Sequence, residues 1–413
     1  MRRVAVTGIG VVSPLGNSAA ELFANAAAAR SGIARLDTPF CTRLVAPIAA
    51  SVHFDGAAHF EPPKLRMLDR VSQFALVAAR QSIAEAHCDF AGVDSQRVGV
   101  FVGTGMGGSQ TSDDGYRTLY AEQSDRIKPF SVLMAMNNAP AAWIGIEYAL
   151  TGPNLTYSTA CSSSAVAIGE AWLRIRSGDL DIAIAGGAEA PLSFGTLKAW
   201  EALHTLAAID GDDPSASCKP FAKNRSGMVL GEGATMLVLE EWDRAIARGA
   251  TVQGELIGYG LVTDASHITR PSVAGQATAM RAALRSAACA PAAIDSINAH
   301  GTGTLANDPV ETAAIKEVFG AQAKRIPISA TKSMHGHLLG AAGALEFALA
   351  LLSMRNSVLL PTMHLSEPDP ECDLDYVPNE ARSNVAVQTC MSNSFAFGGT
   401  DAVLIARGSK QDA

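Results

Sequence analysis

Cys161 is the residue whose surroundings most strongly suggest nucleophilic chemistry. A short predicted strand, Leu155–Ser158, precedes it, and a helix with Ile168 and Trp172 on one face follows after a run of small residues. A cysteine at such a strand-to-helix turn lies near the helix N-terminus, where the partial positive charge favours a thiolate. The alternative is a buried structural cysteine, which is the more common role of a single cysteine.

Two histidines also follow predicted strands. His300 comes after the apolar run Ile294–Ile297, and His337 opens a helix rich in Ala and Gly. Catalytic groups concentrate on loops that a rigid element positions. The helix N-terminus is expected to lower the pKa of His337, and a neutral imidazole can donate a hydrogen bond to a carbonyl. Each histidine alone is more often structural, but two of them beside a similarly placed cysteine favour a shared site.

A metal site is the main alternative for these histidines. His300, His335 and His337 could form a three-histidine zinc site. Converging His-x-His pairs occur mostly in strands, whereas His335 and His337 stand where a helix is predicted to begin. We therefore expect no metal ion.

Two glycine-rich segments resemble nucleotide-binding loops. The segment 103–108 matches GxGxxG after a predicted strand, but the following Ser-Gln-Thr-Ser-Asp-Asp-Gly is too polar and broken to form the first helix of a dinucleotide-binding unit. The segment 8–13 lacks the third glycine of the motif, and the chain contains neither GxSxG nor HExxH. No nucleotide or other cofactor is expected.

The elements that must position these residues alternate between strands and helices. Several strands are apolar throughout, as in sheets covered on both faces, so an α/β architecture is predicted. The chain divides near residue 250, and each half, 1–250 and 251–413, opens with a strand that contains two close glycines (Gly8 and Gly10; Gly258 and Gly260). The predicted strands are Val4–Val12, Val98–Val102, Leu180–Ala185, Ala234–Leu239, Gly254–Val262, Ile294–Asn298, Arg325–Ser329 and Ala402–Ala406. The predicted helices are Leu68–His87, Phe130–Leu150, Ser162–Arg176, Gly275–Ala288, Pro309–Phe319 and Leu338–Met354.

The composition argues against several classes of function. The 413 residues carry a net charge of −8 with a pI of about 5.6, whereas nucleic-acid binders are usually basic. Seven scattered cysteines without a CxxC pair predict neither disulfides nor a zinc site, and indicate a reducing cytoplasm. The N-terminus does not resemble a signal peptide, and no apolar run approaches the ~20 residues that span a bilayer. We therefore expect a cytoplasmic protein without membrane or nucleic-acid partners.

Short motifs spread over essentially the whole chain carry a family resemblance. They are Val6-Thr-Gly-Ile-Gly, Thr159-Ala-Cys-Ser-Ser, Asn298-Ala-His-Gly-Thr-Gly-Thr, Thr331-Lys-Ser, Gly336-His-Leu-Leu-Gly-Ala-Ala-Gly and Asn393-Ser-Phe-Ala-Phe-Gly-Gly-Thr. In these motifs the chain resembles β-ketoacyl-acyl-carrier-protein synthases of the elongating type (synthase II-like), within the thiolase superfamily. The resemblance implies a thiolase-like α/β fold with two similar halves in a layered α-β-α-β-α arrangement, usually as a homodimer.

The same motifs separate the chain from related families. True thiolases carry a second reactive cysteine near the C-terminus, where this chain has Phe395-Ala-Phe-Gly-Gly. Initiating synthases pair their cysteine with His and Asn, whereas this chain has two histidines. Chain-length-factor subunits lack the nucleophile that Cys161 would supply.

The resemblance also implies an activity, that of a 3-oxoacyl-[acyl-carrier-protein] synthase, an acyltransferase of fatty acid biosynthesis that needs no cofactor. Cys161 would carry the acyl group, and the backbone N–H groups of Cys161 and Phe397 would form the oxyanion hole. His300 and His337 would stabilise the enolate that forms as a malonyl group on the acyl-carrier protein loses carbon dioxide. The enolate carbon would then attack the acyl group on Cys161.

Further positions match supporting residues of that family. The resemblance assigns Lys332 and Glu346 to the support of the histidines, Phe397 to the gate, Thr302 and Thr304 to the pantetheine arm, and Met106 and Phe395 to the substrate pocket. The carrier protein is acidic in this family, so a basic patch is expected to meet it. The candidates for this patch are Lys64, Arg66, Arg126 and Lys128.

Three positions depart from the family pattern and leave alternatives open. His335 stands where a threonine is common, Ala396 replaces a glycine beside the gate, and Arg270 stands where a small residue is usual. These departures favour, as an alternative, a specialised ketosynthase of a polyketide, polyene or modified acyl pathway. A non-catalytic partner subunit and a zinc hydrolase are the less favoured interpretations. In place of a second copy, a related ketosynthase-like subunit could also complete the dimer.

Overall fold

The computed structural model describes residues 1–90, 92–211 and 213–408. Ten strands form one hydrogen-bonded sheet in the order β10-β9-β13-β14-β8-β1-β7-β6-β4-β5. These strands are β1 (Val4–Val12), β4 (Val98–Gly103), β5 (Asn154–Tyr157), β6 (Ile182–Glu189), β7 (Gly233–Glu241), β8 (Gly254–Thr263), β9 (Ser296–Asn298), β10 (Ile328–Ser329), β13 (Thr389–Ser394) and β14 (Thr400–Arg407). The short pairs β2 (Ile33–Arg35) with β3 (Ile48–Ala50) and β11 (Val358–Leu359) with β12 (Arg382–Ser383) lie outside this sheet.

The strand order is symmetrical about the contact between β1 and β8. Moving outward from β1 through β7, β6, β4 and β5, the pairings are antiparallel, antiparallel, parallel and parallel. The same succession runs outward from β8 through β14, β13, β9 and β10. β1 and β8 pair directly only at Ala5 with Glu255 and Val6 with Gly254. The sheet therefore consists of two similar five-stranded halves joined by a narrow seam.

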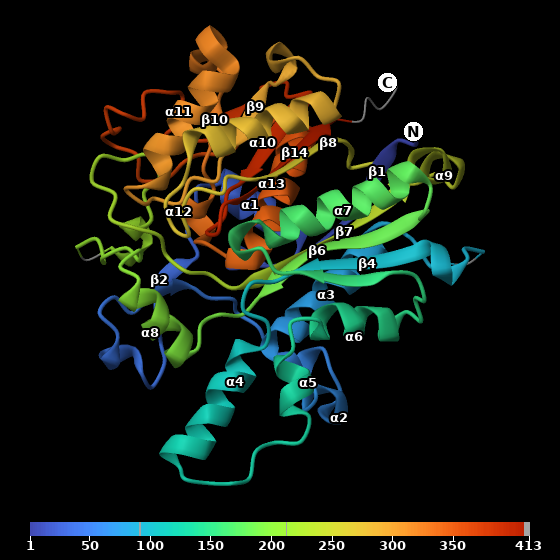
Figure 1. Cartoon of the computed structure of the whole chain (residues 1–413), viewed down its shortest axis with the longest axis vertical. Helices are drawn as coiled ribbons and strands as arrows, with labels where there is room; N and C mark the ends of the chain where they lie inside the picture. The colour runs from blue at the N-terminus through green and yellow to red at the C-terminus, as the bar shows by residue number, and fades with distance from the viewer. Residues whose placement is uncertain (91, 212, 409–413) are drawn as a thin grey trace.

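Helices form three layers around these halves. Figure 1 shows α10 and α11 on one side, α3 and α6 on the other, and α7 with α13 between the two halves of the sheet. α7 and α13 contact strands of both halves. The helices are α1 (Ala19–Ala27), α2 (Pro62–Leu65), α3 (Arg70–Glu85), α4 (Ser109–Tyr116), α5 (Ser131–Ala135), α6 (Ala139–Glu147), α7 (Ser163–Ser177), α8 (Phe194–Ala202), α9 (Trp242–Ala247), α10 (Val273–Ser286), α11 (Asn307–Phe319), α12 (Lys332–His335) and α13 (Ala342–Asn356).

The composition of α13 explains its central position. Every residue from Ala342 to Met354 is buried, and all but a few of them are apolar. A helix that is apolar all round is stable only when other elements cover it on all sides. Its side chains and those of α7 form one core cluster, and separate clusters lie under α3 and under α10 with α11. These clusters fill the spaces of the predicted α-β-α-β-α arrangement.

The paired glycines that open each half mark equivalent close contacts. An added Cβ would lie 1.8 Å from the Ala78 carbonyl oxygen of α3 at Gly10, and 2.3 Å from the Ala279 carbonyl oxygen of α10 at Gly260. Only glycine allows a helix backbone to approach a strand this closely. Since the contact recurs in both parts of the chain, we propose that the predicted boundary near residue 250 separates two structurally similar halves.

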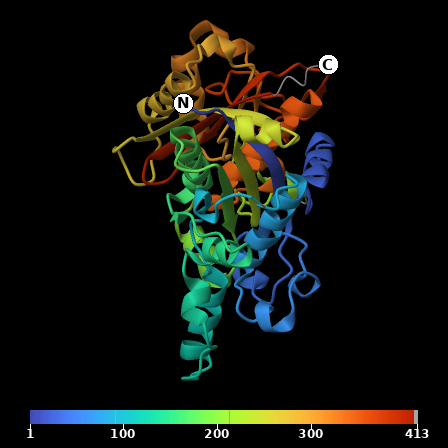
Figure 2. The ribbon, with the colours of Figure 1, turned by 90° about the vertical axis from the view of Figure 1, so that its right-hand side faces the viewer.

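Several predicted elements differ from the observed ones. The single helix predicted over 130–150 is two helices, α5 and α6, because Pro140 occupies the first turn of α6 and starts a new helix there. The polar segment after Gly108, which we expected to be irregular, forms α4. Figures 1 and 2 show α4 and the segment after it extending away from the body of the molecule, where a polar helix is solvated. The expectation of no helix there was wrong.

The described part of the chain contains no helix that is both long and apolar enough to cross a membrane.

Replacing Gly10 with Val should destabilise the fold. The new side chain would overlap the Ala78 carbonyl, so one element must shift, and we expect the free energy of unfolding to fall by about 3 kcal/mol. Urea denaturation followed by circular dichroism measures this change. Gly115→Ala is the matched control, because that glycine lies in α4 and an added Cβ would meet only Cδ1 of Ile127, at an ordinary contact distance of 3.8 Å. An alanine there should raise helix stability by up to about 1 kcal/mol. Equal stability of the Gly10 variant and the native chain would contradict the close-contact argument.

Candidate active site

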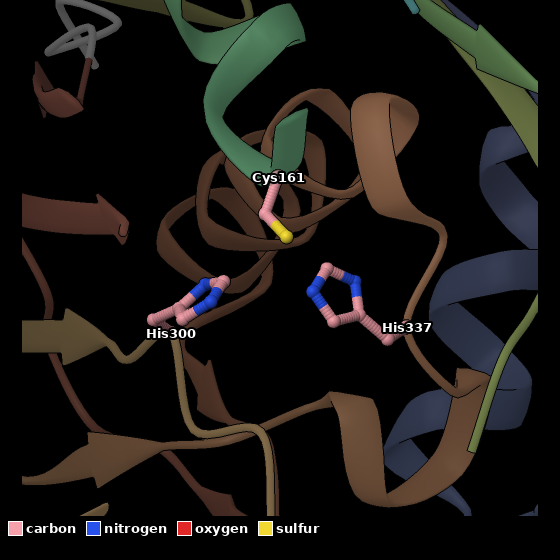
Figure 3. Close-up of side chains that lie close together, drawn as sticks. All are labelled: Cys161, His300 and His337. Atoms are coloured by element: carbon pink, nitrogen blue, oxygen red, sulfur yellow. The ribbon is translucent and has the colours of Figure 1, made fainter. Parts of the chain in front are cut away.

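Three predicted catalytic residues converge at one buried point. Reactive atoms of Cys161, His300 and His337 all lie within 4.8 Å of one another. Figure 3 shows the cysteine sulfur directed between the two imidazole rings. Each of the three residues is at most 5% exposed. The imidazole rings meet edge to face with their centroids 5.4 Å apart.

The symmetry of the sheet explains this convergence. Cys161 lies in a 3-10 turn, η5 (Ala160–Ser162), between β5 and α7. His337 precedes a similar turn, η9 (Leu339–Ala341), between β10 and α13. β5 and β10 hold equivalent positions in the two halves, and η5 contacts η9 in the middle layer. The two strand-to-helix turns therefore face each other, and His300 joins them from the end of β9.

Burial controls the protonation state of Cys161. Desolvation raises the pKa of its thiol to about 12, although the Lys332 charge and a hydrogen bond from the Phe397 backbone N–H act in the opposite direction. The thiolate predicted from the helix N-terminus is therefore not the resting form, because loss of solvent disfavours the charged state more strongly. The sulfur nevertheless faces a backbone donor, and Ala160 before it is held at a φ of 51°.

The hydrogen-bond partners of His337 define its tautomer. The Leu339 backbone N–H donates to Nδ1 at 3.1 Å, so Nδ1 carries no hydrogen. Burial and then the Lys332 charge lower the pKa of the ring well below its usual value, so it is neutral. A neutral ring with a bare Nδ1 carries its hydrogen on Nε2. Nε2 has no other partner among the described residues and is free to donate to a substrate.

Lys332 imposes the same tautomer on His300. Its ammonium donates to the His300 carbonyl oxygen at 2.6 Å and lies 3.3 Å from Nδ1. An ammonium can only donate, so Nδ1 of His300 accepts and the ring hydrogen is on Nε2. Burial, Lys332 and His337 together lower the pKa of His300 well below its usual value. His300 and His337 are thus both neutral Nε2–H donors.

The predicted supporting residue Glu346 pairs with Lys332 inside the protein. Both side chains are only 1% exposed and form an ion pair through one carboxylate oxygen. The other oxygen, Oε2, has no hydrogen-bond partner among the described residues. Burial raises the pKa of Glu346 to about 7, and Lys332 opposes this shift. The pair therefore places a compensated positive charge directly behind the His300 ring.

His335 does not join the cluster. Its Nδ1 donates to the Gly336 carbonyl at 2.8 Å, and its Nε2 lies 3.0 Å from the Thr331 hydroxyl. Both ring nitrogens are thus used locally, and the three-histidine zinc arrangement does not form. Cys161, His300 and His337 are close enough to bind a metal ion, but the Lys332 ammonium behind His300 would repel a second cation.

A cavity of about 550 Å³ of empty space opens onto the cysteine. Its lining includes the predicted substrate residues Thr302, Thr304 and Phe395, and the predicted gate residue Phe397. Phe395 meets the His300 ring edge to face at 6.0 Å, and Phe397 stacks on Trp200 of α8 at 6.1 Å. The described residues that line this cavity do not include Met106, which is 39% exposed elsewhere. This cavity, which we call the active-site tunnel, is therefore bordered by the predicted catalytic residues, the two threonines and the predicted gate.

Comparisons with known proteins agree over the whole length of the chain. Residues 1–245 match the model for the β-ketoacyl synthase N-terminal domain, and residues 253–366 match the C-terminal domain. The chain belongs to the β-ketoacyl synthase family. It is 42% identical to 3-oxoacyl-[acyl-carrier-protein] synthase 2 of Coxiella burnetii and 39% identical to the Staphylococcus aureus protein of that name. Each alignment covers 98% of both chains.

Solved structures of ketosynthases share the fold. A β-ketoacyl synthase from Burkholderia phymatum is 36% identical with a TM-score of 0.91, over 99% of this chain and 100% of that one. A ketosynthase solved with its type II PKS acyl-carrier protein is 31% identical with a TM-score of 0.92 and the same coverage. The predicted thiolase-like α/β fold is confirmed.

Two buried acids that the sequence analysis missed hold the His300 loop. Glu311 accepts the backbone N–H groups of His300 and Gly301 at 2.8 and 2.9 Å, and Asp308 accepts that of Thr302 at 3.2 Å. Both acids lie in the first two turns of α11, directly after the loop that they bind. Acidic residues at a helix N-terminus were a usable signal for this role.

Glu189 is a third buried acid that escaped sequence analysis. Its carboxylate accepts backbone N–H groups of Gly105, Met106 and Gly340 at 2.6, 2.9 and 2.9 Å. Burial raises its pKa to about 7, and these hydrogen bonds oppose the shift. Glu189 ends the apolar strand β6, and no local pattern indicates that it connects the Met106 loop to the turn after His337.

The residues of the predicted carrier-protein patch are in different environments. Arg66 and Lys128 line one surface cavity together with Phe130 and Met134. Lys64 is instead bound in an ion pair with Glu147, which also pairs with Arg80. Arg126 is exposed in the segment before α5. The structure therefore brings Arg66 and Lys128 together and leaves Lys64 engaged within the fold.

The imidazole rings of His300 and His337 should remain neutral from about pH 8 to about pH 6, because their pKa values lie well below the usual 6.5. Nitrogen NMR of the histidine-labelled protein should show no titration of these two rings over that range. The Lys332→Met, Glu346→Gln double variant removes the buried charge pair. The pKa values of His300 and His337 should then rise, and titration of the two rings should begin at a higher pH. Titration of both rings near pH 6.5 in the native protein would contradict the assignment.

Proposed function

We propose that this enzyme is a 3-oxoacyl-[acyl-carrier-protein] synthase that elongates an acyl chain by decarboxylative condensation. The observation that supports this most directly is the pair of neutral Nε2–H donors beside the sulfur of Cys161. A proton-accepting histidine would activate a hydrolytic water or a serine. Two donors with no proton-accepting nitrogen directed at the substrate are instead suited to stabilise an enolate oxygen.

The first half-reaction transfers the acyl group to the enzyme. The Cys161 sulfur attacks the acyl thioester, and the backbone N–H groups of Cys161 and Phe397 stabilise the oxyanion. The thioester bond breaks, and the carrier thiol leaves with the proton that the cysteine loses. Burial of the sulfur keeps water away from the new acyl-cysteine bond.

The second half-reaction forms the carbon–carbon bond. The malonyl thioester carbonyl accepts hydrogen bonds from His300 and His337 while carbon dioxide leaves. The resulting carbanion attacks the acyl carbonyl on Cys161, and the bond to sulfur breaks. The product is a 3-oxoacyl thioester two carbons longer, and the cysteine regains a proton. Thr302 and Thr304, whose hydroxyl oxygens are 2.8 Å apart in the tunnel, are placed to bind the amide groups of a pantetheine arm.

The relatives favour this activity over the alternatives from the sequence. The 42% and 39% identical relatives are both named 3-oxoacyl-[acyl-carrier-protein] synthase 2, whereas the type II PKS ketosynthase is 31% identical. This difference favours fatty acyl elongation over a specialised pathway. A partner subunit without activity has no need for Cys161 between two neutral donors.

Replacing Cys161 with Ala should abolish covalent loading. Incubation with an acyl-carrier thioester should add the mass of the acyl group to the native chain, detectable by intact-protein mass spectrometry, and add nothing to Cys161→Ala. An adduct of equal yield on the variant would remove the basis for this proposal.

His337→Ala should still load the acyl group but lose malonyl decarboxylation by about 10²- to 10³-fold, because one enolate donor is missing.

An acidic acyl-carrier protein is the proposed partner. The ketosynthase at 31% identity was solved in complex with its acyl-carrier protein. In this chain Arg66 and Lys128 flank a cavity lined by Phe130 and Met134, which suits a partner with acidic and apolar side chains on one surface.

Charge reversal should test this surface. The double variant Arg66→Glu, Lys128→Glu should raise KM for a carrier-bound thioester about tenfold, because like charges would then face each other. It should leave kcat for a pantetheine thioester unchanged, since the tunnel is intact. Arg285→Glu, an exposed cation on α10, is the control. Equal effects of the two charge reversals would argue against the patch.

A second copy of the chain is proposed to cover the free edge of the sheet. β5 is an edge strand, and Leu155 on it is 38% exposed. Nearby elements leave further apolar side chains exposed, including Ile146 of α6 and Val132 and Leu133 of α5. An edge strand with apolar surroundings is a template for pairing with another chain.

Sedimentation equilibrium should therefore give about twice the chain mass of 42.8 kDa. The Leu155→Glu, Ile146→Glu variant should sediment as a single chain, because two buried charges would oppose association. Ile246→Glu on α9, where the side chain is also exposed, should not change the mass. A native protein that sediments as a monomer would exclude the homodimer.

A further inference from the structure

Two carboxyl groups meet beneath the loop that carries Phe397. Asp401 is the second residue of β14 and pairs with Val262 of β8. Asp264 directly follows Thr263, the last residue of β8, and its backbone N–H donates to the Gly399 carbonyl at 2.9 Å just before β14 begins. The start of α10 packs against both residues: a Cβ added at Gly275 would lie 2.4 Å from Cβ of Asp264 and 3.1 Å from Oδ2 of Asp401. The pairing of β8 with β14 therefore places two acids side by side in a covered position.

Asp401 is the less solvated of the two. Its residue is 3% exposed, and its Oδ2 is buried without a hydrogen-bond partner among the described residues. Asp264, by contrast, is partly exposed, and its Oδ1 accepts the Ser266 N–H at 3.0 Å. Burial first, and then the charge of Asp264, raise the pKa of Asp401 to about 8. The neutral acid is the form that this environment favours at neutral pH.

The charged and titratable groups around Asp401 come from two segments, the 264–271 loop and α11. Besides Asp264, the 264–271 loop carries His267 and Arg270, which line the active-site tunnel. α11 contributes Glu311, which acts on Asp401 as a like charge. The first turn of α10 has no charged side chain, although its N-terminal N–H groups favour an anion. The raised pKa of Asp401 indicates that burial and the two acids outweigh the influence of that helix end and of the Arg270 guanidinium.

This acid pair connects two loops that line the active-site tunnel. The Ala396 backbone N–H lies within hydrogen-bonding reach of the Asp401 carboxyl. The Asp264 backbone N–H donates to the Gly399 carbonyl at 2.9 Å, and the Gly398 N–H donates to the Ile268 carbonyl at 2.8 Å. Ala396 directly precedes Phe397, whose N–H faces the sulfur of Cys161. A movement of the Asp401 carboxyl therefore displaces Ala396 and, through the next peptide unit, the Phe397 N–H that faces Cys161.

We propose that protonated Asp401, packed beside Asp264 under the start of α10, is a positioning residue that holds the 395–399 loop closed over Cys161. Loss of that proton to solvent places a second anion beside Asp264 and Glu311, and the 264–271 and 395–399 loops separate. The Phe397 N–H then leaves the sulfur, and acyl transfer slows. The proposal rests on the acyl-transfer function given above.

The sign of the pH dependence follows from the two states. The closed state holds a proton on Asp401, whereas the open state exposes the carboxyl to water and releases it. Raising the pH through about 8 therefore favours the open loop, and lowering it favours the closed loop. Cys161 responds in the opposite direction, because a higher pH increases the thiolate fraction. A comparison of variants is needed to separate the two effects.

Single-turnover loading of Cys161, followed by mass spectrometry from about pH 6 to about pH 9.5, provides this comparison. The ratio of native to Asp401→Asn rates cancels the titration of Cys161, which the two proteins share. We expect this ratio to be constant below pH 7 and to fall about tenfold per pH unit above the inflection, since one proton is lost. Asparagine keeps the size and the acceptor for Ala396 but has no charge to gain. A ratio that is constant at every pH would show a purely structural role and overturn the proposal.

Asp264→Asn gives a second, independent variant. Removing the neighbouring charge should lower the pKa of Asp401, so the alkaline loss should move to lower pH rather than disappear. An unchanged inflection would also overturn the proposal.

Infrared spectroscopy tests the protonated carboxyl without any enzyme assay. At pH 7 the native protein should show a carboxylic acid band that Asp401→Asn lacks. Absence of this band from the native protein would exclude a protonated Asp401 and overturn the proposal. A native chain that never forms an acyl adduct, yet shows this band, would instead contradict only the proposed function.

Discussion

The buried ammonium of Lys332 is the interaction on which the chemistry of the site depends. It fills the space behind His300, so that ring must present its Nε2 hydrogen to the tunnel. Together with burial, which is the larger cause, the same charge lowers the pKa of His300 and His337, and it favours the thiolate of Cys161. Glu346 on α13 compensates the charge within the protein. One ion pair thus lowers the cost of forming an anion at the sulfur and keeps both neighbouring rings neutral.

Around this ion pair, buried carboxyl groups hold the backbone of the catalytic loops. Glu311 and Asp308 bind the His300 loop, and Glu189 binds the Met106 loop together with the turn after His337. Each of them accepts main-chain N–H groups that have no strand or helix partner at that point. A buried N–H group without a partner costs about as much as a lost hydrogen bond, so these acids stabilise loop conformations that would otherwise be unfavourable. They define the positions of the catalytic atoms without touching the substrate.

Sequence patterns were sufficient for the elements with strong periodicity and for the motif residues. β1 and α3 match the predicted segments closely, because uninterrupted apolar runs and helical spacing are unambiguous there. β13 was missed because Thr-Cys-Met-Ser-Asn-Ser has no apolar run; it is a strand only because β9 and β14 pair with it on either side. Likewise, Cys161 could be chosen from its local context, but its protonation state depends on burial by distant segments. The contributions of Glu189 and Asp401 arise from contacts across the sheet, which spacing along the chain does not encode.

The close glycine contacts described for the fold have a mechanical consequence. At Gly10 and Gly260 the strand backbone and the covering helix leave no room for a single additional carbon atom. Such interdigitated surfaces cannot slide past each other without colliding, so both outer helices are fixed to the sheet as rigid units. Sliding of whole layers is therefore an unfavourable way to admit a long acyl chain. The deformation that substrate entry requires is confined to the short segments at the strand ends, and the stiff body around them restores their positions after each passage.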